Sequence, residues 1–548
     1  MSGLIGTDGK PLTSKKNLHD FIASGLSNGA ASIDSPTMAG WNWWGGAADD
    51  DITAHLDVVR QRCRDLTLNA PVVAGMVNTL VTNIVGQGLN PEPTPDAKML
   101  GMTDDEAQEW KKKVSRCLDV VLKSKDFDMR RRDNFHELTQ LVVRSALESG
   151  DVFVAMPLVK RSGSLIDLRV QVIEADCIAN PSGWSNPNDE ETTGDVFGGV
   201  EVGNHDEVIA YHVATRHPLS KRTRFNIGPK EYIRRDYVRV PAFGAETGRR
   251  NMLHIMRSQR PGQRRGVPLL APIVESMKIV DRYMKAELQA ALIQALFTAY
   301  IQSERPEAAL GQFIEGQNFP AESGMMSSQD FYEQNGMIQM GSGTIGFLAP
   351  GDSIVPISTT RPNSGFGPFV EAMLKMMGAA IGIPYELLIL HFQSSFSASR
   401  AAMSVARAWF KVLMKWVVDD FCQPVIEEVM AMLVAGGHID APEFFTNPMK
   451  RKEYCSFKWS GPGAIIINPV AEVDAAIKRA SVGFTTFQQE TAEMNGGDWS
   501  VNAAERHQEQ VVFENAPWNP TLTRVGTADL KVATGGGGDD TNPENGGG

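Results

Sequence analysis

The chain has 548 residues, which exceeds one ordinary domain and predicts about two to four structural units. Hydrophobic residues make up 42% and charged residues 22%, a composition typical of a globular protein that buries a sizeable core. The formal net charge of −12 excludes a protein that coats DNA through bulk positive charge.

Charge is distributed unevenly along the chain. Residues 216–265 hold fourteen Lys and Arg against three acidic residues, whereas residues 181–207 hold seven acidic residues and no Lys or Arg. This segregation predicts distinct surfaces. They are either solvated faces or complementary halves of a contact between copies of the chain.

The five cysteines contain no Cys-x-x-Cys pair, so free thiols in a reducing cytoplasm are expected rather than a disulfide framework. The longest apolar stretch, 286–301, is interrupted by Glu287, Gln289 and Gln294, and the N-terminus lacks a secretory pattern. We therefore expect an intracellular protein that does not span a membrane.

Residues 1–50 are rich in Gly, Ser and Ala and predict a flexible arm. Three tryptophans interrupt this arm, at Trp41, Trp43 and Trp44. Such large side chains need a surface to bury against, which is either the body of the same chain or a neighbouring copy.

Helical patterns come next, followed by strand-like ones. Thr103 and Glu106 have the spacing of a capping box, in which each side chain bonds the other residue's backbone N–H. The expected helices cover 52–66, 71–85, 103–125 and 133–149. The expected strands lie within 152–159, 168–174, 208–213 and 237–242. Helices followed by strands indicate an α+β fold rather than alternating βα units.

A long helix is predicted over residues 268–302. Two stripes run along it at helical spacing, which suits a strut packed against other helices. The apolar stripe includes Met277, Val280, Met284 and Leu288. The charged stripe includes Glu275, Lys278, Arg282 and Lys285.

Residues 303–360 are polar and rich in Gly and Gln, and a second helix is expected over 366–381. A loop with small polar residues and two aromatics follows. It comprises His391, Phe392, Gln393, Ser394, Ser395, Phe396 and Ser397. A very long helix over 398–434 should be kinked by Pro424. Two further helices are expected over 469–480 and 502–514, before a disordered glycine-rich tail at 533–548.

No catalytic or metal-binding motif is apparent. The Gly-x-Gly-x-x-Gly match at 341–346 is followed by Pro350 and Gly351, which do not begin the helix that a dinucleotide site requires. The chain has no phosphate-binding loop of the Gly-x4-Gly-Lys-Ser/Thr type and no His-Glu-x-x-His pattern. His205, His212 and His217 lack zinc-ligand spacing. We expect no enzyme, no cofactor and no metal.

Four segments, in the same order across about 40–510, resemble lambda-type phage portal proteins. The first begins at Arg62-Cys-Arg-Asp-Leu and continues to Gly88, and the second runs from His254 through Arg260-Pro-Gly to Pro268. The third is Leu348-Ala-Pro-Gly-Asp-Ser, and the fourth runs from Gly382-Ile-Pro-Tyr-Glu-Leu to Phe396-Ser-Ala-Ser-Arg-Ala. The resemblance implies a portal-type fold with a wing, stem, clip and crown.

The resemblance also implies domain boundaries. The arm at 1–50 precedes a wing at 51–267, stem helix 1 at 268–302, a clip at 303–360 and stem helix 2 at 361–387. A tunnel loop at 388–397, a second wing segment at 398–466, a crown at 467–532 and the tail at 533–548 complete the chain. Arg260, Arg264 and Arg265 join the three tryptophans as candidates for the subunit interface.

By the same resemblance the protein forms a ring of twelve copies at one capsid vertex. Double-stranded viral DNA enters and leaves through its channel, and the tunnel loop faces that DNA. The implied partners are the terminase large subunit, a head–tail connector protein and the major capsid or scaffold protein. The protein would reside in the virion, and in the host cytoplasm during assembly. Two alternatives remain open: a packaging nuclease or ATPase, and a capsid or tail adaptor without a channel.

Overall fold

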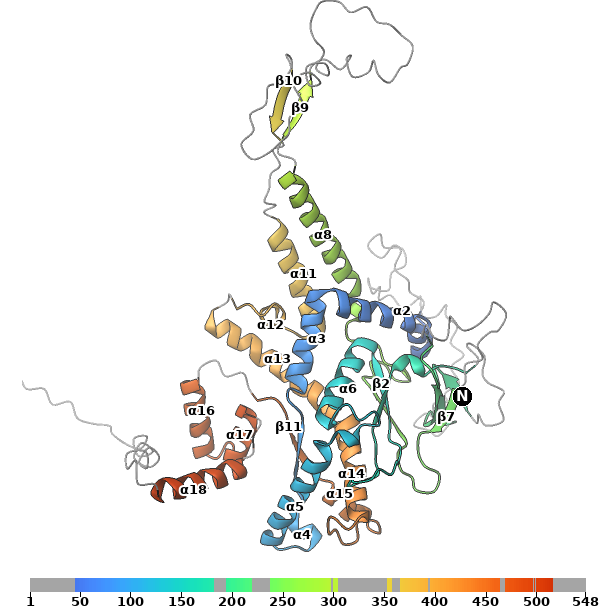
Figure 1. The fold of residues 1–548 in the computed structure, drawn as a ribbon, viewed down its shortest axis with the longest axis vertical. Helices are drawn as coiled ribbons and strands as arrows, with labels where there is room; N and C mark the ends of the chain where they lie inside the picture. Colours follow the sequence, from blue (N-terminus) through green and yellow to red (C-terminus); the bar gives the residue numbers. More distant parts are fainter. Residues whose placement is uncertain are drawn as a thin grey trace, which may run out of the picture.

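The protein is described from a computed structural model of the chain. The structure describes residues 45–181, 194–218, 237–296, 299–303, 352–356, 365–392, 395–463, 469–495, 497 and 499–515. Helices and strands are mixed within these ranges, which confirms the α+β expectation at that level. A body of helices and small sheets carries a two-helix stalk, and a group of C-terminal helices lies beside the body (Figure 1).

The N-terminal helices of the body begin at identifiable signals. Pro71 is the first residue of its helix, where its missing N–H costs nothing. The predicted capping box is confirmed: Glu106 accepts from the Thr103 backbone N–H at 2.8 Å, and Thr103 accepts in return. Asn134 and Glu137 form a second box that the sequence reading missed. These helices are α2 (Ala48–Asn69), α3 (Pro71–Ile84), α4 (Ala97–Leu100), α5 (Asp104–Leu122) and α6 (Phe135–Ser149).

Two antiparallel sheets form one side of the body. One has the order β3-β2-β8 and the other β4-β5-β6-β7. Each of the four predicted strand runs overlaps an observed strand, whereas β4, β5 and β8 were not predicted. The strands are β2 (Asp151–Ala155), β3 (Gln171–Ile173), β4 (Asp195–Phe197), β5 (Val200–Val202), β6 (Val208–Ala214), β7 (Tyr237–Pro241) and β8 (Met252–Met256).

A third antiparallel pair joins distant parts of the chain. Strand β1 (Asn90–Pro93) pairs with β11 (Phe457–Ser460), so that Asn90 lies opposite Ser460. This pairing joins residues 457–460 to the segment that directly follows α3. The remaining short elements of the body are η3 (Lys125–Phe127), η4 (Ala175–Cys177) and α15 (Pro448–Tyr454).

The long helix expected near Pro424 is continuous but irregular. It consists of α13 (Phe396–Val417), the π-helical turn η6 (Val418–Cys422) and α14 (Gln423–Ala435). The Gln423 N–H donates to the Val418 carbonyl, so the backbone hydrogen bond just before Pro424 spans five residues instead of the four of an α-helix. Pro424 therefore lies in the first turn of α14, where a missing N–H is tolerated.

One large apolar core holds the body and the base of the stalk together. It includes Leu80 of α3, Val142 of α6 and Val429 of α14, and Phe421 stacks on Phe135 at 5.8 Å. Met277 and Val280, near the start of the first stalk helix, belong to the same core. The stalk is therefore anchored by apolar burial at its base.

The stalk consists of α8 (Val274–Leu296), preceded by η5 (Ala271–Ile273), and α11 (Phe366–Ile381). The bounds of α11 were predicted correctly. The expectation of one helix over 268–302 was wrong at both ends, because strand β9 (Ala299–Ser303) begins three residues after α8 ends. Tyr300 and Ile301 favour a strand, and β9 pairs with β10 (Asp352–Pro356) beyond the helices (Figure 1).

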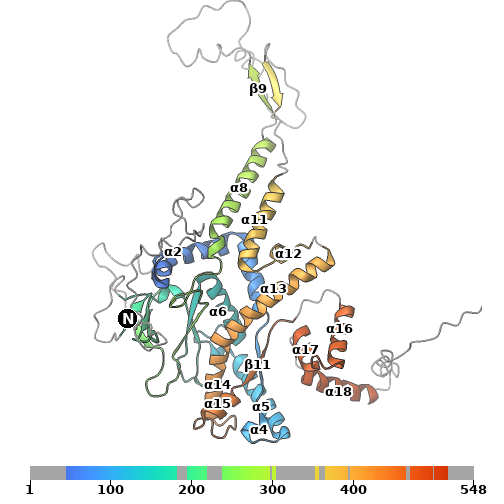
Figure 2. The same cartoon turned by 180° about the vertical axis from the view of Figure 1, so that it is seen from behind.

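The C-terminal helices are α16 (Pro469–Ser481), α17 (Phe487–Asn495) and α18 (Trp499–Asn515). The sequence reading missed α17. Arg479 of α16 makes two bonds to Glu490 of α17, and Arg407 of α13 donates to the Glu493 carbonyl at 2.9 Å. Figure 2 shows this group on the opposite side of the body from the four-stranded sheet.

Two sequence expectations can be compared directly with the structure. All five cysteines are free, as expected. Among the described residues, no helix combines the length and the apolar character that crossing a membrane requires.

Candidate functional site

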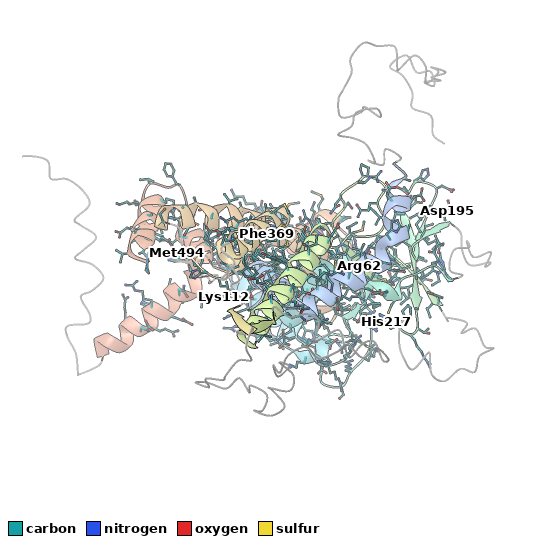
Figure 3. All side chains as sticks on the ribbon, turned by 90° about the horizontal axis from the view of Figure 1, so that it is seen from above. Arg62, Lys112, Asp195, His217, Phe369 and Met494 are labelled. Carbon is teal, nitrogen blue, oxygen red and sulfur yellow. The ribbon has the colours of Figure 1, made fainter. Side chains whose placement is uncertain are left out.

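Much of the stalk surface is left uncovered by the rest of the described chain. Helices α8 and α11 lie side by side, and Tyr283 of α8 contacts Phe366 and Phe369 of α11 at ring-centroid distances of 5.4 and 5.2 Å. Figure 3 looks down on the stalk and places Phe369 near its axis, with His217 and Met494 on opposite sides. Both helices therefore have faces that contact nothing else in the described chain.

The predicted apolar stripe on α8 divides into two halves. Met277 and Val280 are 2% and 0% exposed and pack into the body core, whereas Met284 and Leu288 are 41% and 62% exposed. The upper half of the stripe faces outward, together with apolar neighbours on both helices. The exposed apolar residues of the stalk are Ile279, Met284, Leu288, Leu292, Phe369 and Met376. Apolar side chains concentrated on a two-helix stalk indicate a surface that another molecule covers.

The predicted charged stripe of α8 is exposed along its length. Glu275, Lys278, Arg282 and Lys285 are all exposed. Lys285 bonds Asp281, one turn earlier, at 2.8 Å. An exposed pair of this kind contributes little to stability, so it does not account for the stability of α8. The charged side chains remain available to a molecule that covers the stalk.

The loop after the stalk begins and ends differently from the expectation. Residues 385–388 form the short helix α12 (Tyr385–Leu388), and His391 donates its backbone N–H to Glu386. His391, Phe392 and Ser395 are exposed. Gln393 and Ser394 lie outside the described residues. Phe396 and Ser397 were expected in the loop but begin α13, because Ser395 takes the extended conformation of a helix N-cap.

Gly382 determines where the chain leaves the stalk. It ends α11 with φ of 76°, and a Cβ at this position would lie 2.6 Å from Trp409 Nε1. Trp409 of α13 donates to the Ile381 carbonyl at 3.0 Å. The glycine thus allows α13 to pack against the end of α11, and this contact places the loop beside the stalk.

A buried charge cluster lies near the segment that enters the stalk. Asp151, at the start of β2, accepts from Arg60 of α2 and from Arg265, each at 2.7 Å. It also accepts the Gly266 backbone N–H at 3.0 Å, and His254 of β8 lies 3.4 Å away. Burial alone raises the pKa of Asp151, but Arg265 and Arg60 reverse this and hold the pKa well below its usual value. Two strands, α2 and the segment leading to α8 therefore meet at one ionised carboxylate.

The three arginines proposed for the subunit interface are used within the subunit. Arg265 is buried and bonded to Asp151, so its assignment to an interface is wrong. Arg264 pairs with Asp49 and Asp206, and Arg260 pairs with Asp51 at 2.7 Å. Their charges are neutralised by acids of the same chain, which removes the reason for assigning them to a neighbour. Trp41, Trp43 and Trp44 lie outside the described residues.

The same correction applies to other cations of the 216–265 segment. Arg239 makes two bonds to buried Glu201, and Arg249 bonds Glu428 of α14 at 2.8 Å. These arginines hold parts of the body together. Their charges are therefore matched within the subunit, and the alternative in which this segment supplies half of an intersubunit contact does not draw on them.

One set of potential metal ligands occurs among the described residues. Ligand atoms of Glu174, Asp176 and His217 all lie within 4.8 Å of one another. His217 bonds Glu174 at 3.0 Å, and Arg64 already pairs with Asp176. Because this arginine competes for the carboxylate, the arrangement is accounted for by ion pairing.

We expect stability to fall with pH below about 6.5, in part through His254. Burial lowers the pKa of His254 below its usual 6.5, despite its bond to Asp151. As pH falls, the unfolded chain therefore binds this proton first, and stability is lost from about 6.5 down to the lowered pKa. Denaturant titrations at several pH values would measure the slope. His254→Asn should reduce it, and an unchanged slope would contradict this contribution.

The sequence profile of phage portal proteins of the lambda family matches residues 34–413. The chain therefore belongs to the lambda family of phage portal proteins, which are structural components of the virion. It is 23% identical over 529 residues to the portal protein of Escherichia phage N15 and 22% identical to portal protein B of Escherichia phage lambda. Each alignment covers 94% of both chains.

Solved structures with a similar chain come from gene transfer agent particles. A chain from the virion of the native particle has a TM-score of 0.41 at 11% identity, covering 83% of this chain and 94% of that one. A chain from the neck of the empty particle, computed with C6 symmetry, has a TM-score of 0.42 at 12% identity. That comparison covers 78% of this chain and 92% of the other.

Proposed function

We propose that the protein forms a ring at one capsid vertex, and that double-stranded viral DNA passes through the ring's central channel during packaging and ejection. Membership of the portal family supports this role as a DNA channel at the vertex. The observation that carries the ring is the stalk, because its outward apolar residues need a covering surface. A neighbouring copy supplies that surface when identical subunits are arranged head to tail around a closed ring.

The elements suit the parts of a portal subunit. The body is the wing, α8 and α11 are the stem, and β9 with β10 forms the base of the clip. Helices α16 to α18 are the crown. Most of the clip, 304–351, lies outside the described residues. In this proposal the clip docks the terminase large subunit and later the head–tail connector.

The loop between α12 and α13 is proposed to face the DNA. Residues 388–397 contain no Asp, Glu, Lys or Arg, so the loop can touch the duplex without binding its phosphates through cations. Twelve copies of the chain would carry about twelve times −12 formal charges, which repels the DNA backbone and favours passage. In this proposal the aromatic Phe392 provides neutral contact.

Assembly is tested first, by negative-stain images of the purified full-length protein. Rings with a central hole are expected, and counting their symmetry tests the proposed twelve copies. The major capsid or scaffold protein is the expected partner at the vertex, with assembly taking place in the host cytoplasm. Monomers under all assembly conditions would contradict the proposal.

Replacing His391 and Ser395 with lysine should reduce DNA packaging roughly tenfold without preventing ring assembly. Twelve copies would add about twenty-four cations beside the duplex, and each neutralised phosphate makes contact tighter and more salt-dependent. The readout is nuclease-protected DNA per procapsid at several salt concentrations. The matched control carries Gln61→Lys and Gln108→Lys, two exposed positions on α2 and α5. Equal packaging by both variants would show that the loop does not line the channel.

A further inference from the structure

Arg169 is a buried arginine whose hydrogen bonds are incomplete. Its side chain is fully buried in the body. Nη1 donates to the Ile166 and Leu168 carbonyls, each at 2.7 Å. Nε and Nη2 are shielded from solvent and have no hydrogen-bond partner in the structure. A buried guanidinium with two unmatched nitrogens, which carry three N–H groups, is costly, because a protein rarely leaves such donors without an acceptor.

Arg161 lies close to Arg169, and both of its terminal nitrogens are hydrogen-bonded, as is usual for a shielded arginine. Its guanidinium donates to the backbone carbonyls of Asp126, Asp128 and Met129 at 2.8 to 3.0 Å. Arg161 therefore ties two segments together. Arg169, in contrast, leaves three of its five N–H donors unused.

Arg169 lines a cavity of about 400 Å³ between the end of α5 and the turn at 161–166. The walls are mainly apolar, with Val121, Phe127 and Ile166 buried. Ser124 and Ser164 add hydroxyls, Asp126 adds a carboxylate, and Val120 is 63% exposed beside the cavity. Apolar walls with a few polar groups, one of them an unmatched cation, are typical of a pocket that orients a ligand through few polar contacts.

Pairing near the cavity favours an anion. Arg169 interacts electrostatically with two cations, Arg131 and Arg161, and with two anions, Asp126 and Asp167. Asp126, the carboxylate of the cavity lining, lies 3.0 Å from Arg131 and 3.8 Å from Arg161. That carboxylate is therefore paired, whereas Arg169 makes no ion pair among the described residues.

We propose that this cavity binds an oxyanion group, a carboxylate or a phosphate, through Nε and Nη2 of Arg169. These two donors point in parallel and match two oxygens of such a group, which is the geometry that makes arginine preferred for both anions. Because the donors are shielded, binding in this proposal requires the part of the turn around Gly163 to move outward. Gly163 has φ of 79°, and no heavy atom lies within 4 Å of the position that a Cβ would take there.

The test is the thermal unfolding midpoint of the full-length protein in sodium phosphate, sodium acetate and sodium chloride at equal ionic strength and pH. A ligand that binds the folded state raises the midpoint, and we expect a rise of about 2 °C over chloride. A response to phosphate alone identifies a phosphate-bearing ligand. A response to acetate identifies a carboxylate-bearing one.

Three variants locate the response. Arg169→Met should abolish it, and Val120→Glu should also abolish it by placing a competing carboxylate beside the cavity. Arg130→Met removes an exposed cation from the surrounding surface and should keep it. If Arg169→Met fails to fold, Val120→Glu decides the question because that position is exposed. No rise in the wild type, or an equal rise in Val120→Glu, would overturn the proposal.

Discussion

Asp151→Asn is expected to destabilise the subunit by about 3–5 kcal/mol. The substitution preserves shape but removes the negative charge that Arg60 and Arg265 share. Both guanidiniums are buried, so each would become an uncompensated charge in the interior of the body. Breaking a buried pair from one side is costly even where the intact pair adds little.

Denaturant unfolding of Asp151→Asn measures this loss. Asp119→Asn is the matched control, because it removes the same charge from an exposed pair with Lys123 at 2.9 Å. That control should change the free energy of unfolding by less than about 1 kcal/mol. If the two variants were equally stable, the Asp151 cluster would not hold the body together. A destabilised Asp151→Asn should also form the proposed rings less well, since the segment that enters the stalk is bound there.

Local signals explain which elements were predictable. The capping box at Thr103, the proline at the start of α3 and the glycine that ends α11 each act within a few residues. They were visible in the sequence, and the structure confirms them. Boundaries failed where local preference was mixed, as at residues 297–303, where a helical pattern passes into Tyr300 and Ile301.

The Asp151 cluster was not predictable from the sequence. Its members lie 91 and 114 residues from Asp151, so no spacing rule connects them. Arg265 lies in a basic segment, a pattern that predicts a surface residue. These residues meet through long-range packing: β2 pairs with β8, which brings His254 opposite Phe153, and α2, which carries Arg60, packs against α6 before β2. The incomplete bonding of Arg169 is invisible in sequence for the same reason.

Burial also separates two positions of the stalk that the sequence pattern treats alike. Met277 and Leu288 lie on one apolar stripe, so the pattern alone predicts that a charge at either position blocks assembly more than folding. Met277 belongs to the body core, so the structure predicts a different effect there. Met277→Asp should destabilise the subunit itself by several kcal/mol, because an unpaired carboxylate would be buried.

Leu288→Asp should instead abolish ring assembly while changing the free energy of subunit unfolding by less than about 0.5 kcal/mol. Leu288 is 62% exposed in the subunit, so an aspartate there remains hydrated until a neighbour covers it. In a ring the same charge would be buried at every subunit contact, and the penalty is repeated around the circle. Size-exclusion chromatography measures assembly, and thermal unfolding measures folding. The control is Gln289→Asp, at the next exposed position of α8. Normal rings from Leu288→Asp would show that this stripe faces solvent and does not form the contact between stems.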